Sequence, residues 1–257
     1  MTALEQQLKN PVWYSLNETH KKFAVKYKEV LFYDQEVCTF GAFFDEDRTT
    51  AASNQYLKTT DSFFFVSENK TPKVDSANVS LEKKIDGCQM VLNELSDVSI
   101  TEEIVLLGDE HINEIYDLVW LVMPGYYRRR TFEMGNYYGI FKEGKLVSIT
   151  GQRMQTDLFI EVSAVVTHPD FTRRGLAKQL IAHTTKEILK ENKKPILHTN
   201  KGNSAIPLYE KLGYTLTRDM NWWLYRRKST IKLFTNECKR QQTIVNVYIP
   251  NKISMLF

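Results

Sequence analysis

The chain has 257 residues, of which 42% are hydrophobic and 25% are charged, so it has the size and composition of one large or two small globular domains. Its net charge of +3 is too small for bulk nucleic-acid binding, and no apolar run suggests a signal peptide or a membrane span. Cys38, Cys88 and Cys238 lie far apart without a CxxC pair, and the five histidines show no HExxH spacing, which argues against a disulfide framework or a metal site. We therefore expect a cytoplasmic, metal-free protein.

The first 98 residues have the pattern of a small α/β half without a catalytic motif. Residues 16–27 place apolar and aromatic side chains on one helical face. Aromatic and β-branched runs predict strands at 30–33, 37–44 and 62–66. Residues 69–80 are polar and rich in turn formers, which indicates a surface loop. We place a domain boundary between residues 98 and 99.

The pattern becomes sharper between residues 99 and 228. A helix is predicted to follow Asp109 as its cap and to end at Pro124-Gly125, and Glu143-Gly144 predicts a hairpin turn. Strands are predicted at 100–107, 137–141, 145–150, 159–166, 195–199 and 222–225. Residues 229–257 contain two β-prone runs that the sequence does not place, and we treat them as a C-terminal extension.

A basic glycine turn follows the strand at 159–166 and opens directly into an amphipathic helix. The first four N–H groups of a helix have no partner within it, and the helix dipole makes that end positive. Gly175 removes the Cβ that would block a phosphate, while Arg173 and Arg174 add full positive charge beside it. Such a turn suits a pyrophosphate, although Arg-Arg-Gly alone is also compatible with a solvated helix start.

Two motifs in this segment resemble those of the GNAT superfamily of acetyl-CoA-dependent N-acetyltransferases. The phosphate motif [QR]-x-x-G-x-[GA] matches at Gly175 and Ala177, with Thr172 in its first position. The later motif N-x-x-A-x-x-L-Y-E-K-x-G-[FY] matches from residue 205 to residue 214. Its asparagine lies one residue closer to the alanine, at Asn203, and Gly202 occupies the usual position.

The resemblance covers residues 100–226 and implies a mixed α+β fold of the GNAT type. In that fold a central mixed sheet contains two splayed parallel strands and is flanked by helices. The stretch from residue 124 onward also resembles a bacterial branch that carries an additional N-terminal half. That half is expected to be a degenerate copy of the fold that binds no cofactor.

The same resemblance implies an acetyl-CoA-dependent N-acetyltransferase. The primary amine of a small molecule or peptide would attack the thioester directly in a ternary complex. By this resemblance Glu161 is the general base and Tyr209 donates a proton to the departing thiolate. The cofactor-binding residues are expected to be Val165, Val166, Thr167, Thr172, Arg173, Arg174, Gly175, Leu176, Ala177 and Asn203.

Several alternatives stay open from the sequence. Glu161 is also compatible with a polar strand residue, Tyr209 with a core tyrosine, and His198 is left unassigned. A non-catalytic acyl-CoA-binding regulatory module is the alternative function, whereas nucleic-acid binding through the arginines at 128–130 is disfavoured by the modest net charge. In the family this arginine loop borders the acceptor site, which would favour an acidic acceptor. A homodimer stays open beside a monomer.

Overall fold

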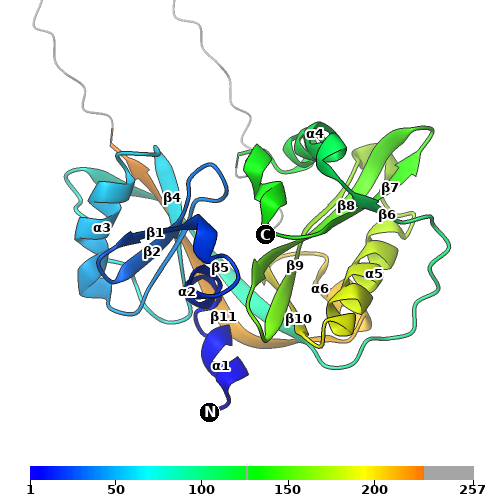
Figure 1. The fold of residues 1–257 in the computed structure, drawn as a ribbon, viewed down its shortest axis with the longest axis horizontal. Helices are drawn as coiled ribbons and strands as arrows, with labels where there is room; N and C mark the ends of the chain where they lie inside the picture. Colours follow the sequence, from blue (N-terminus) through cyan, green and yellow to red (C-terminus); the bar gives the residue numbers. More distant parts are fainter. Residues whose placement is uncertain (126, 229–257) are drawn as a thin grey trace, which may run out of the picture.

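The computed structural model describes residues 1–125 and 127–228, and the predicted C-terminal extension lies outside these ranges. The described strands form one 11-stranded mixed sheet in the order β1-β2-β3-β4-β11-β5-β10-β9-β8-β7-β6. The sheet runs through two lobes, and β5 and β11 cross from one lobe to the other (Figure 1). The predicted mixed α+β class is therefore confirmed.

The first 92 residues form the elements of the first lobe and the long strand β5, which continues into the second lobe. These are α1 (Ala3–Leu8), α2 (Pro11–Asn17), η1 (Lys21–Phe23), β1 (Ala24–Tyr27), β2 (Val30–Tyr33), β3 (Phe40–Phe43), η2 (Glu46–Arg48), α3 (Thr49–Tyr56), β4 (Ser62–Ser67) and the long β5 (Val79–Leu92).

The second lobe follows in chain order. Its elements are β6 (Val105–Leu107), η3 (Asp109–His111), α4 (Ile112–Val122), η4 (Arg129–Met134), β7 (Tyr137–Lys142), β8 (Lys145–Gln155), β9 (Phe159–Thr167), η5 (Pro169–Phe171), α5 (Leu176–Lys190), β10 (Lys194–Asn200), α6 (Ile206–Lys211) and β11 (Tyr214–Arg227).

The strands β5 and β11 are exchanged between the two lobes. β11 pairs with β4 on one side and β5 on the other, while β5 also pairs with β10, and all three pairings are antiparallel. A shared core cluster contains Leu8 and Phe64 from the first lobe and Phe159 and Trp222 from later in the chain. The sheet and this core cluster both contain residues from before and after the predicted domain boundary at residue 98.

Helices α4 and α5 cover opposite faces of the second lobe. Tyr137 packs with residues of α4 and its neighbour Tyr138 packs with residues of α5, because successive side chains of a strand point to opposite faces. In α5, Leu180, Ile181 and Ile188 recur at helical spacing and are fully buried. Burial of this face fixes the N-terminal end of α5 beside the end of β9.

Three local predictions from the sequence are wrong. The predicted helix at 16–27 ends at Asn17, because Tyr27 pairs with Val30 in the β1–β2 hairpin. Gly108, not Asp109, precedes the helical turn that leads into α4. The predicted strand at 100–107 is ordered as a strand only over Val105–Leu107, where it pairs with β7.

Candidate active site

The parallel strands β9 and β10 separate after three residue pairs. Their register covers Lys194 to Ile196 opposite Phe159 to Glu161 and then stops. Just beyond this point β9 carries a bulge against β8, and Ala164 adopts a φ of 48° in the left-handed region. Among the described strands, the backbone of β9 from residue 162 onward therefore has no partner on the β10 side, where an extended ligand can bind it as at a sheet edge.

The turn before α5 has the geometry that its sequence predicts. Gly175 is the N-cap residue with a φ of 78°, and a Cβ at this position would meet no atom of the described residues within 4 Å. The neighbouring Arg173 also has a positive φ of 60°. Leu176 is buried and anchors the helix start, whereas residues 172–175 are exposed. The turn thus presents the positive end of a 15-residue helix to open space.

The side chains around this turn differ in whether they already form hydrogen bonds within the protein. Thr172 donates its hydroxyl to the Pro169 carbonyl at 3.0 Å, so it closes the turn. Arg174 donates to the Asp170 carbonyl at 2.9 Å and stacks over the ring of Phe171. Arg173 makes no hydrogen bond or ion pair within the described part of the chain, which makes it the more available charge for an anion.

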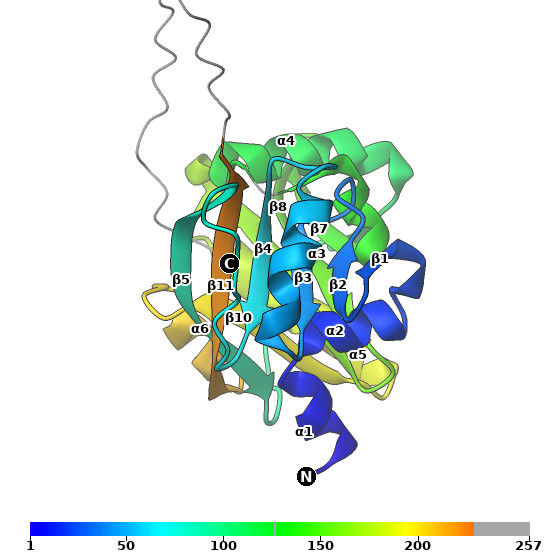
Figure 2. The ribbon, with the colours of Figure 1, turned by 90° about the vertical axis from the view of Figure 1, so that its left-hand side faces the viewer.

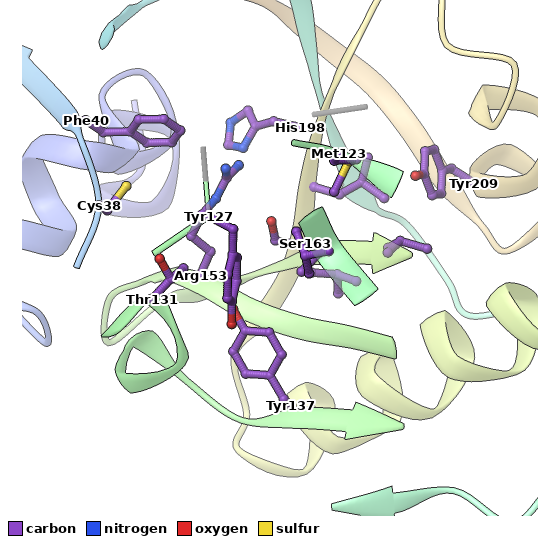
Figure 3. Close-up of a pocket in the computed structure, with 15 residues that line it drawn as sticks. Cys38, Phe40, Met123, Tyr127, Thr131, Tyr137, Arg153, Ser163, His198 and Tyr209 are labelled. Atoms are coloured by element: carbon purple, nitrogen blue, oxygen red, sulfur yellow. The ribbon is translucent and has the colours of Figure 1, made fainter. Parts of the chain in front are cut away.

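A cavity opens where β9 and β10 separate, on the face covered by α4 (Figure 3). Both lobes line it. Its walls are formed by Cys38, Phe40, Val119, Met123, Tyr127, Thr131, Tyr137, Arg153, Val162, Ser163, Ala164, Val165, Leu197, His198 and Tyr209. Most of these side chains are apolar, so the cavity favours neutral groups except near its few polar side chains.

Tyr209 lies at one end of this cavity, with its hydroxyl pointing inward (Figure 3). The residue is 4% exposed, and burial raises the pKa of its hydroxyl to about 12. Within the described residues this hydroxyl has no hydrogen-bond partner. Tyr209 is thus a protonated donor that faces the cavity and is free to act on a ligand.

Glu161 lies behind the cavity wall in a buried polar network. Its two carboxylate oxygens accept hydrogen bonds from Arg153 Nε and Nη2 at 2.8 and 2.6 Å, and one also contacts His198 Nδ1 at 2.7 Å. Burial alone would raise the pKa of Glu161, but Arg153, and then His198, outweigh it and lower the pKa to about 2. The carboxylate is therefore ionised and fully engaged, and it does not line the cavity.

The protonation of His198 follows from its second partner. The Gln89 side-chain amide donates to the Leu8 carbonyl at 2.9 Å, and its nitrogen lies 3.0 Å from His198 Nε2. An amide nitrogen only donates, so Nε2 accepts and Nδ1 carries the hydrogen that Glu161 receives. In this arrangement His198 is neutral, and both of its ring nitrogens are engaged within the protein.

Asn203 fastens the turn between β10 and α6. Its amide nitrogen donates to the Thr199 hydroxyl at 2.6 Å, and its amide oxygen accepts from the Ala205 N–H at 2.8 Å. The side chain is 5% exposed. These contacts account for Asn203 without a cofactor, whereas its predicted cofactor contact stays a prediction.

Comparison with known proteins agrees with this geometry. Residues 137–224 match the model of the FR47-like protein family. A crystal structure of a protein assigned to the GNAT family from Novosphingobium aromaticivorans superposes with a TM-score of 0.76 at 27% identity, covering 86% of this chain and 99% of that one. The chain has the GNAT fold. The resemblance to the GNAT superfamily predicted from the sequence is thereby confirmed.

Two more distant structures share this GNAT fold. A GCN5-related N-acetyltransferase from Kribbella flavida has a TM-score of 0.54 at 14% identity, covering 86% of this chain and 94% of that one. A tandem GNAT protein from the clavulanic acid biosynthesis pathway has a TM-score of 0.50 at 11% identity and covers 77% of both chains. No curated protein matches the sequence. At these identities the likenesses show the fold, and the tandem protein fits an additional N-terminal half.

Sequence reasoning missed the polar centre of this GNAT cavity. Arg153 comes from β8 and Phe40 from the first lobe, and only the sheet register brings them to Glu161 and His198. The arginine loop at 128–130, by contrast, is engaged elsewhere, because Arg130 pairs with Glu133 and Asp34.

Residues 1–125 and 127–228 contain no group of three or more His, Cys, Asp or Glu side chains suited to a metal ion. Over the same ranges no helix is long and apolar enough to cross a membrane.

Proposed function

We propose that the protein transfers the acetyl group of acetyl-CoA to the primary amine of a small molecule or peptide. The observation that carries this proposal is the separation of β9 from β10, which leads from the exposed turn at Gly175 to a cavity with a free tyrosine hydroxyl. The GNAT fold supports the general activity, and the contents of the cavity support the chemistry.

The cofactor would bind along β9 with its pyrophosphate at the start of α5. The N–H groups from Gly175 to Ala177 and the charge of Arg173 supply donors to the phosphates. The backbone of residues 165–167, which has no partner on the β10 side, would bond the pantetheine arm as a neighbouring strand does. The thioester would then lie at the bulge near Ala164, beside the cavity.

The reaction would proceed by direct attack of a neutral amine on the thioester carbonyl. A C–N bond forms, the C–S bond breaks, and the amine loses a proton to solvent. A backbone N–H near the bulge would stabilise the charge that develops on the carbonyl oxygen. Tyr209 would donate its proton to the leaving sulfur and then regain one from solvent, since burial favours its protonated hydroxyl at neutral pH.

Glu161 is better suited to positioning than to direct proton transfer. A pKa of about 2 makes it a weak proton acceptor, and its carboxylate faces Arg153 and His198 rather than the cavity. We therefore assign it the role of holding these two side chains in place. The apolar walls would instead favour the neutral form of the amine, because burial without a partner disfavours a charged group.

Thiol release from acetyl-CoA tests the proposal. We expect release in the presence of at least one member of a panel of amines, polyamines, amino acids and peptides. A parallel calorimetric titration measures acetyl-CoA binding. Tight binding without release from any acceptor would favour the non-catalytic acyl-CoA-binding module, and absence of binding would contradict both functions.

A further inference from the structure

The Arg153 guanidinium has one engaged edge and one free edge. Its Nε and one hydrogen of Nη2 bond the two oxygens of Glu161 in a bidentate pair. A guanidinium has five N–H donors, so both hydrogens of Nη1 and the second hydrogen of Nη2 remain. Within the described residues Nη1 makes no hydrogen bond to the protein. The free Nη1–Nη2 edge has the geometry that pairs with a second carboxylate.

The Arg153 side chain that carries this free edge lines the cavity. Arg153 is one of the lining residues, with 12% of its side chain exposed, and its guanidinium lies between Phe40 and His198 (Figure 3). The guanidinium carbon lies over the Phe40 ring, 4.9 Å from its centroid. Because Glu161 fixes the other edge, the orientation of the free edge is set before any ligand arrives.

The charges around the cavity favour an anion over a cation. Among the described residues Arg153 is the only Lys, Arg, Asp or Glu that lines it, and Glu161 is not part of the wall. The neighbouring His198 is neutral in its observed bonding. A polyamine would find no carboxylate in the wall to pair with its second charge, whereas a carboxylate would find two parallel N–H donors.

We propose that the acetyl acceptor is a small amino acid whose carboxylate binds the free Nη1–Nη2 edge of Arg153. This inference rests on the proposed acetyl transfer and names its substrate class. The Ser163 hydroxyl, two residues along β9 from Glu161, also lines the cavity and makes no hydrogen bond within the described residues, so it is a further donor for the carboxylate. The amine of the same molecule would then face the bulge at Ala164.

The carboxylate of the acceptor can be removed chemically without changing the protein. We would compare thiol release with alanine and phenylalanine against release with alaninamide and phenylalaninamide, at equal concentrations of neutral amine. We expect kcat/KM to be about 10- to 100-fold higher for the acids, the range of a charge-assisted hydrogen-bonded pair. Release that is equal for acids and amides, or faster for amides, would overturn the inference while leaving acetyl transfer in place.

A paired variant tests Arg153 itself. In Arg153→Gln/Glu161→Gln both buried charges are removed together, which avoids an isolated charge in the core. We expect the ratio of acid to amide to fall toward one, with thermal denaturation and circular dichroism confirming that the variant folds. The control is Arg48→Gln, an exposed arginine of the first lobe, and it should keep the wild-type ratio. An unchanged ratio in the folded double variant would contradict the role of Arg153.

Binding of the product gives a readout that needs no turnover. N-acetylalanine and its amide would be titrated into the protein saturated with CoA. Tighter binding of the acid by about 10-fold or more, lost in the double variant, supports the subsite. If no amine releases thiol but the acid still binds preferentially, the proposed catalysis fails and the carboxylate subsite stands.

Discussion

The sheet contains two parallel strand pairs, β3 with β4 in the first lobe and β9 with β10 in the second. Aromatic side chains pack around the first pair, whereas a cavity lies beside the second. Both pairs are joined by a crossover that contains a helix, α3 in one case and α5 in the other. The sheet order places β11 beside β4 and β5 beside β10, so the two lobes mirror each other around the central strands. A shared topology therefore does not by itself make a binding site.

The first pair is closed by aromatic side chains. All four residues of β3 are buried, and Figure 2 shows α3 lying over this part of the sheet. Phe32 stacks on Tyr56 of α3 with ring centroids 4.2 Å apart, and Phe63 and Phe65 pack edge to face at 5.0 Å. These rings fill the space that a ligand would need.

The starts of the two crossover helices carry opposite charges. Asp45, Glu46 and Asp47 precede α3, where Arg173 and Gly175 precede α5. Carboxylates at a helix N-terminus satisfy the positive end of the dipole and repel a phosphate. The difference teaches that the chemistry of the turn and the packing of the strands, rather than the crossover itself, select the lobe that binds.

Among the variants that distinguish the two lobes, removal of the Tyr209 hydroxyl should have the largest effect on catalysis. Tyr209→Phe is expected to lower kcat by about 10²- to 10⁴-fold, because the proton donor to sulfur is lost. Acetyl-CoA affinity should stay unchanged, since the hydroxyl has no partner in the protein's described residues. The matched control is Tyr56→Phe in α3, whose hydroxyl bonds the Tyr33 carbonyl. Equal kcat values for Tyr209→Phe and wild type would remove the acid role.

Neutralising Glu161 alone should destabilise the protein more than neutralising Glu161 and Arg153 together. Glu161→Gln leaves the Arg153 charge buried without a counter-ion, which is expected to lower the free energy of unfolding by about 3–5 kcal/mol. The double variant Arg153→Gln/Glu161→Gln should recover a large part of this loss. Urea denaturation of the wild type, both single variants and the double variant measures the coupling. Additive effects would show that the pair does not act as a unit.

A charge change at the start of each crossover helix shows directly which lobe contributes to acetyl-CoA binding. Gly175→Asp adds a carboxylate and a Cβ at a left-handed position, and we expect the Kd for acetyl-CoA to rise about 100-fold or more. Arg48→Asp places the same side chain at the N-cap position of α3 and should leave the Kd within about twofold of wild type. Similar losses in both variants would mean that the first lobe contributes to cofactor binding.

Acid should loosen the junction between the lobes by a smaller amount. His20 contacts Tyr33 of the first lobe and the Met134 carbonyl of the second, and burial lowers its pKa from 6.5 to about 4. A depressed pKa means that the unfolded chain takes up the proton first, so stability is present above pH 6.5 and declines as the pH falls toward 4. Chemical denaturation across this range should show that decline, and His20→Gln should flatten it. An equal decline in the variant would assign it to other groups.

The sequence predicted those features that depend on neighbouring residues. The strand at 30–33 has the predicted bounds, and the strand at 159–166 is one residue longer, because aromatic and β-branched runs define them locally. The glycine turn was predictable for the same reason, since Gly175 and the amphipathic helix after it are adjacent in the chain. The strand β5 was missed, because its first part, around Glu82 to Lys84, is exposed and charged while its later part is buried.

The polar centre of the cavity depends on contacts that the sequence does not contain. Arg153 and Glu161 meet across a β8–β9 pairing that includes a register shift, and His198 joins them from a strand 37 residues later in the chain. The low pKa of Glu161 arises from these two neighbours, which the resemblance that implied a general base did not include. The positioning role proposed for Glu161 follows from this register.

The stoichiometry of acetyl-CoA binding tests the central difference between the two strand pairs most directly. Isothermal titration of the wild-type chain should give one site per chain, since among the described residues the β9–β10 pair lies beside a basic, exposed helix start and the β3–β4 pair lies beside an acidic one. Two sites per chain would show that the aromatic lobe also binds the cofactor. No measurable binding would show that neither parallel pair is a cofactor site, and would contradict the account.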